Sequence, residues 1–141
     1  MKAAQPGLAG AILATAFTFN AFACGFCIED KIAAVYDHAV VTRAVAQRHQ
    51  VAFFAVEGNI SPGKGSRHTL EAIAESLAGV DKGSARVSVE AASLSVAFDP
   101  ARVPVEDLEF KLGRKLAGKG LKAGIMRIME KPSEFKVTGK R

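Results

Sequence analysis

The order of hydrophobic patterns between residues 51 and 128 constrains the fold of this chain more than any other feature. β-prone or alternating runs cover 51–56, 84–90, 93–99 and 121–128. Between the first and second runs Ser66 is suited to cap a helix, and between the third and fourth Pro104 is suited to begin one. The order β-α-β-β-α-β is a split-βαβ arrangement, in which two helices cover one face of a four-stranded antiparallel sheet. The sequence therefore predicts an α+β, ferredoxin-like sandwich.

The same periodicity predicts which side chains form the core of this unit. Inward positions on the two helices and on the second and third strands are apolar and recur at the spacing of one buried face. These positions are Leu70, Ile73, Leu77, Leu108, Leu112, Val87, Val89, Leu94 and Val96.

An extra N-terminal helix is predicted ahead of this unit, over about residues 28 to 48. Apolar residues recur at three- and four-residue steps from Ile28, and Glu29 and Asp30 lie in the first turn, where a helix dipole favours negative charge. We expect this helix to lie outside the four-stranded fold and either to pack across it or to connect it to a membrane.

The N-terminus has the layout of a secretory signal peptide. Lys2 precedes an apolar stretch over 8–23 that ends in the small-x-small pattern Ala21-Phe22-Ala23. Cleavage after Ala23 is the favoured interpretation. One alternative is an uncleaved membrane anchor, because residues 8–28 are about long enough to cross a bilayer. Another is lipidation of Cys24. We therefore expect an exported protein, either periplasmic or attached to the outer face of the inner membrane.

The chain thus divides into four parts. Residues 1–23 are the signal peptide or anchor, 24–50 carry a C-x-x-C motif and the N-terminal helix, 51–129 form the ferredoxin-like domain, and 130–141 are a basic polar tail.

Cys24 and Cys27 are the only cysteines of the chain and carry its most evident chemistry. Their spacing lets both thiols meet one soft metal ion or close a small disulfide, and the start of a helix favours the thiolate form. In an oxidising compartment a disulfide is the resting expectation unless a metal or a reductant keeps the thiols open. The pattern leaves three interpretations open: metal binding, a redox or structural disulfide, and no role in the mature protein.

Residues 51–128 resemble a heavy-metal-associated (HMA) domain, the ferredoxin-like module of copper chaperones and copper-transporting ATPases. The stretches that carry the resemblance are Val56-Glu57-Gly58 and residues 70–80, 86–100 and 103–112. Such domains carry M-x-C-x-x-C in the loop after the first strand, whereas this loop, over 59–66, contains no cysteine. Ser61 and Ser66 lie near the family's thiol positions, and neutral hydroxyls are poor ligands for a soft cation. Either metal binding has been lost and the domain serves docking, or the thiols have moved to Cys24 and Cys27.

The resemblance implies a heavy-metal-binding protein, with Cu(I) as the favoured ion and Cys24 and Cys27 as its ligands. Its partner would be a copper transporter or a cuproprotein. The alternatives are a thiol-disulfide redox protein and a non-catalytic, HMA-like interaction module. No catalytic constellation is visible, so we expect no enzymatic activity, and a formal net charge of only +5 gives no reason to expect a nucleic-acid partner.

Overall fold

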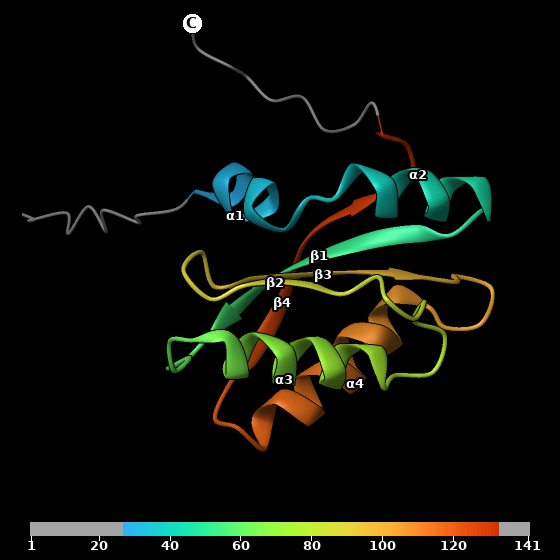
Figure 1. The fold of residues 1–141 in the computed structure, drawn as a ribbon. Coiled ribbons are helices and arrows are strands. Elements are labelled where there is room, and N and C mark those ends of the chain that lie inside the picture. Colours follow the sequence, from blue (N-terminus) through green and yellow to red (C-terminus); the bar gives the residue numbers. More distant parts are fainter. Residues whose placement is uncertain (1–26, 133–141) are drawn as a thin grey trace, which may run out of the picture.

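The computed structural model describes residues 27–132, and these residues contain one four-stranded antiparallel sheet between two layers of helices (Figure 1). The strand order is β2-β3-β1-β4. The elements are α1 (Ile28–Val35), α2 (His38–Ala46), β1 (Gln50–Glu57), α3 (Lys64–Glu75), β2 (Arg86–Ser88), β3 (Ser93–Phe98), α4 (Val105–Ala117) and β4 (Lys122–Met129). From β1 onward this is the predicted β-α-β-β-α-β fold.

The main core lies between the sheet and the pair α3 and α4, which cover a single face (Figure 1). Even-numbered residues of β1 and β3 point into it because successive side chains of a strand alternate between faces. The predicted core residues are found there; Ile73 and Val89 are partly buried at its margin. One start signal was misplaced: α3 begins at Lys64 with Gly63 at its N-cap, so Ser66 lies inside the helix.

A second core lies on the opposite face of the sheet, beneath α1 and α2. It consists of Ile32, Val35, Val40, Val41, Ala44, Val51, Phe53, Ala97 and Met129, with Tyr36, Val45 and Met126 at its margin. Of the two arrangements expected for this segment, packing across the sheet is the one found. The sheet is therefore covered on both faces, and β1 is buried along nearly its whole length.

The single helix predicted over 28–48 is in fact two helices. Tyr36 leaves the helical conformation, and the Asp37 carboxylate caps α2 by accepting hydrogen bonds from the N–H groups of Ala39 (2.9 Å) and Val40 (3.2 Å). An aspartate that satisfies two N–H groups at a helix start stabilises a new N-terminus over a continued helix. The break lets each short helix follow the twisted sheet separately.

Polar contacts fix the N-terminal layer to every part of the sheet. Lys31 donates from Nζ to the carbonyl oxygen of Ala91 (2.6 Å), in the β2–β3 turn. Glu29 forms a two-bond ion pair with Arg127 of β4. Ser95 of β3 donates from Oγ to the carbonyl oxygen of Val35 (2.8 Å), which ends α1. None of the helices within 27–132 has the length and apolar composition needed to cross a membrane.

Candidate metal centre

Cys27 stands immediately before α1, at its N-cap, and its thiol is exposed and free. The helix begins at Ile28, as predicted. Asp30 turns back onto Cys27, accepting hydrogen bonds at Oδ2 from the Cys27 N–H (3.4 Å) and from the Cys27 thiol (3.2 Å). Cys24, the second predicted ligand, lies outside the described residues, so the structure describes one half of the C-x-x-C pair.

The chemistry available at Cys27 follows from this placement. A thiol must lose its proton to bind a metal ion, so binding of an ion at Cys27 would replace the hydrogen bond from this thiol to the Asp30 carboxylate. Exposure leaves the sulfur accessible to an ion or to another thiol.

The helix that carries Cys27 is held in a defined orientation on the fold. The hydrogen bond from Arg127 lowers the pKa of the Glu29 carboxyl below its ordinary value and so favours the charged form that the ion pair needs. Ile32 is completely buried one turn further on. Cys27 is therefore the exposed start of an element that is fixed by packing on one side and by an ion pair at its first turn.

The loop between β1 and α3, where HMA domains carry their thiols, contains only hard or neutral donors. It borders a hollow of about 340 Å³ lined by Asn59, Ser61, Ser66, Thr69 and Lys119, among others. Hydroxyl and amide oxygens with an ammonium group do not bind a soft cation. Gly58, at the start of the loop, has φ +121° and leaves no room for a Cβ, which would lie 2.7 Å from the carbonyl oxygen of Gly120. The loop thus keeps a tight backbone but offers no thiolate.

α1 and this loop lie at the same end of the sheet but on opposite faces. Figure 1 shows α1 above the end at which β1 finishes and α3 starts, with the loop and α3 below. The sheet therefore lies between α1, which follows Cys27, and α3, which contains Ser66.

Two of the histidines, His49 and His68, contact acidic side chains. His68 has a side chain that is 75% exposed and lies 3.4 Å from Glu71 on the same helix. His49, in the connection between α2 and β1, lies 2.8 Å from Asp81, in the connection between α3 and β2. It also lies 3.8 Å from Asp99, in the connection between β3 and α4. Sequence reasoning missed this cluster because its members are far apart in the chain and match no motif. Within the part of the chain that the structure covers, no three or more His, Cys, Asp and Glu side chains have a metal-binding geometry.

The chain is partly similar to several proteins of known structure. No family model matches the chain, and no curated protein matches it. Oxidized MerP from Ralstonia metallidurans CH34 is similar with a TM-score of 0.45 and 23% identity, over 56% of this chain and 99% of MerP. A copper binding domain from HMA7, a P-type ATPase, has a TM-score of 0.46 and 24% identity, over 56% and 96% of the two chains. The CopZ metallochaperone has a TM-score of 0.41 and 24% identity, over 52% and 98%. At this identity the similarity concerns the fold alone.

Residues 50–129 form a ferredoxin-like fold, as the element order and sheet topology define it. Within that class this chain has two distinctive features. A layer made of α1 and α2 covers the second face of the sheet, and the cysteine that the structure describes stands on this layer instead of in the β1–α3 loop.

Proposed function

We propose that this protein is an exported heavy-metal-binding protein that holds Cu(I) between the thiolates of Cys24 and Cys27. The observation that carries the proposal is the exposed thiol of Cys27 at the start of α1, a helix fixed to the sheet by Ile32 and by the Glu29–Arg127 ion pair. A ligand on a fixed helix needs less ordering when it binds an ion. The resemblance of 51–128 to HMA domains favours a heavy metal over other uses of C-x-x-C.

Cu(I) suits two thiolates better than the other common ions do. Thiolates are soft ligands that select Cu(I) strongly, and two of them complete a near-linear coordination. Each thiol gives up its proton to solvent as the ion binds. The exposed position would also allow a partner thiol to approach and take the ion by ligand exchange.

The proposed setting is outside the cytoplasm. Cleavage after Ala23 would leave Cys24 as the first residue, whereas an uncleaved segment would attach the protein to the outer face of the inner membrane; both keep the two cysteines. The partner would be a copper transporter or a cuproprotein, and the role would be non-catalytic binding or delivery. The mass of the N-terminal peptide from protein purified from cells distinguishes the cleaved, anchored and lipidated forms.

Copper binding is tested by competition between the reduced protein and a chromophoric Cu(I) chelator. We expect the unaltered protein to withdraw copper and a Cys24→Ser, Cys27→Ser variant to withdraw none. A Ser61→Ala, Ser66→Ala variant is the matched control, because it alters two hydroxyl groups at the opposite face, and it should withdraw as much copper as the unaltered protein. A parallel titration with Zn(II) should give weaker binding.

Equal copper withdrawal by the unaltered protein and the double cysteine variant would refute the site. Withdrawal by neither would refute metal binding and leave the redox and interaction-module alternatives. A thiol-disulfide role would then be recognised by reversible oxidation of the pair in a glutathione buffer.

A further inference from the structure

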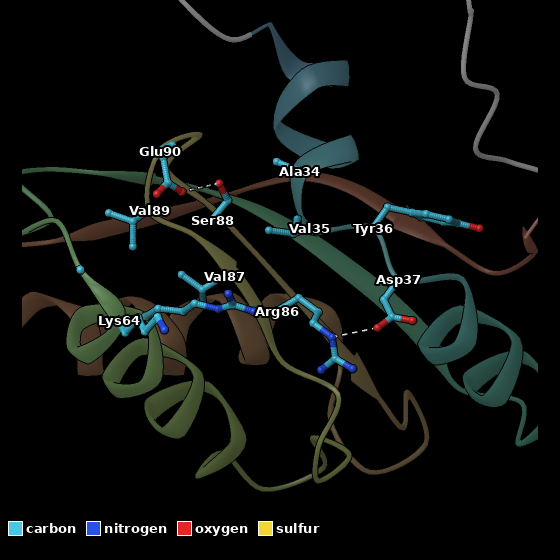
Figure 2. Close-up of a pocket in the computed structure, with 12 residues that line it drawn as sticks. Ala34, Val35, Tyr36, Asp37, Lys64, Arg86, Val87, Ser88, Val89 and Glu90 are labelled. Atoms are coloured by element: carbon cyan, nitrogen blue, oxygen red, sulfur yellow. Dashed lines mark hydrogen bonds and ion pairs between the residues drawn. The ribbon is translucent and has the colours of Figure 1, made fainter.

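A hollow of about 480 Å³ runs along the outer edge of β2 (Figure 2). The connection between α1 and α2 forms one wall through residues 34–37. The first turn of α3 forms the other wall through Gly63, Lys64 and Arg67. Between them lies the edge strand itself with Val87 and Val89. The added N-terminal layer thus converts a sheet edge into a groove with two walls.

Strand pairing determines which backbone groups of β2 face this groove. The N–H of Val56 donates to the carbonyl oxygen of Ala92 (2.9 Å), so even-numbered residues of β3 direct their backbone groups toward β1. Odd-numbered residues consequently face β2, where they lie opposite Arg86 and Ser88. Val87, between those two, directs its N–H and its carbonyl oxygen outward. Within residues 27–132, no side chain makes a hydrogen bond with either group.

Some edge groups of the sheet are satisfied by side chains of the protein, whereas within the described residues those of Val87 are not. The N–H of Ala85, on the same edge, donates to Oε1 of Glu75 (3.2 Å), and the Ala85 carbonyl oxygen accepts from Nη1 of Arg86 (2.8 Å). On the opposite edge of the sheet, the N–H of Ile125 in β4 donates to Oε1 of Glu109 (3.0 Å). Side chains of the protein thus occupy other edge groups, as is usual for exposed strands. Val87 keeps one donor and one acceptor at the spacing that a paired strand requires.

Three basic side chains, Lys64, Arg67 and Arg86, and two acidic ones, Asp37 and Glu90, line the groove around Val87. Lys64 projects from the start of α3, and within the described residues its ammonium group makes no ion pair. Arg67 is bound through Nε to Glu71 (3.1 Å), and Arg86 through Nε to Asp37 (2.9 Å). Figure 2 shows Lys64 and Arg86 below Val87, and Glu90 above Val89, where the Ser88 hydroxyl donates to Glu90 (3.5 Å).

We propose that this groove binds an extended, acidic peptide segment of a partner protein, which adds to β2 as a fifth strand. One residue of the segment exchanges both backbone hydrogen bonds with Val87, and an acidic side chain of the segment pairs with Lys64. Addition of a strand to a free edge supplies affinity through the backbone, and the side chains that alternate along it supply specificity. Val89, partly buried at the margin of the main core, adds apolar surface to the groove, which suits β-branched residues between the acidic ones.

The probe for this site is the peptide acetyl-Val-Glu-Val-Glu-Val-amide, titrated into the full ¹⁵N-labelled chain at about 0.15 M salt, where screening acts over about 8 Å. We expect saturable amide shifts centred on Val87 and Val89. A peptide of the same sequence with alternate backbone nitrogens methylated should produce no such shifts, because it loses its donors. Acetyl-Val-Lys-Val-Lys-Val-amide should bind at least about threefold more weakly.

Variants with exposed side chains test the charge assignment without endangering the fold. Lys64→Gln should weaken binding of the acidic peptide at least about threefold, and Glu90→Gln should strengthen it. Lys119→Gln is the matched control, because it removes the same charge beside the other hollow and should leave binding unchanged. The proposal is overturned if the acidic peptide causes no shifts at millimolar concentration, if they centre on β4, or if the methylated or lysine peptide binds equally well.

Discussion

The second core beneath α1 can be tested by shortening a single side chain, Ile32→Ala. Ile32 is 0% exposed and lies on the face of α1 that packs against the sheet. The substitution removes three methyl or methylene groups, worth about 0.8 kcal/mol each, or about 2.4 kcal/mol in total. The cavity that remains brings the expected loss of unfolding free energy to about 3–4 kcal/mol.

The control is the same substitution one turn earlier. Ile28 belongs to α1 and is 55% exposed, so Ile28→Ala changes the same chemical group without opening a cavity. We expect it to change the unfolding free energy by less than about 0.5 kcal/mol. The two variants share any gain in helix propensity, and the difference between them isolates the packing contribution.

Urea unfolding followed by far-UV circular dichroism measures both effects. With a slope of about 2 kcal/mol per molar urea, Ile32→Ala should lower the midpoint by about 1.5–2 M. If both variants shift the midpoint equally, or if Ile32→Ala costs less than about 0.5 kcal/mol, α1 does not pack on the sheet as described.

Three further predictions concern other parts of the fold. Gly113→Ala should stabilise the protein by about 0.5–1 kcal/mol, because this glycine lies inside α4 with open space at its Cβ position. Gly79→Ala should destabilise the protein, because Gly79 has φ +87° and an added Cβ would lie 2.5 Å from Cγ1 of Val103. Val96→Ala, in the main core, should cost about 2–4 kcal/mol in the same urea assay, and a cost below about 0.5 kcal/mol would place Val96 outside that core. Partial burial raises the pKa of the Asp37 carboxyl, but the Val40 N–H, Arg86 and the Ala39 N–H together lower it below the ordinary value of 3.8. The stability that ionised Asp37 supplies should therefore be lost as the pH falls below about 3.8. Asp37→Asn should remove that part of the pH dependence of the unfolding free energy.

The main fold could be predicted because its local patterns and its tertiary structure agree. α3 and α4 have separate apolar stripes, and the pattern of β3 places Leu94, Val96 and Phe98 on one face, where the structure has them. The misplaced start of α3 is a local matter: Gly63, with φ +124°, takes the N-cap conformation without contributing a side chain.

The second helical layer was harder to predict because its contact surface includes serines. Ser93 and Ser95 alternate with apolar residues in β3 and appear to form a solvent face by pattern alone, yet they are 0% and 2% exposed beneath α1. Their small side chains allow close approach of the helix, and Ser95 satisfies the Val35 carbonyl, one of the unpaired groups at a helix C-terminus. The signal that did exist was β1, whose run from Val51 to Val56 is apolar at every position, as expected of a strand buried on both faces.

The candidate metal site was predicted from the sequence to the extent that two thiols and a helix start define it. The position of Cys27 directly before α1 confirms the relation between motif and helix. The contact with Asp30 was not anticipated, although an acidic residue three positions after an N-cap is a familiar capping pattern. The groove beside β2 had no sequence signal, because its walls come together only through the packing of α1, α2 and α3 around the sheet.

The attachment of α1 to β4 sets an order of assembly along the growing chain. Glu29 and Arg127 are separated by 98 positions, and Met129 closes the core beneath the N-terminal helices. During synthesis, the segment that bears Cys27 is made before β4, but its docking surface is complete only when the last strand has joined the sheet. Contacts of such long sequence separation form late in folding, since the entropy of closing the loop must be overcome first. A chain that stops before Lys122 would lack the Glu29–Arg127 ion pair and Met129 beneath the N-terminal helices, and α1 would keep only its contacts with the other strands.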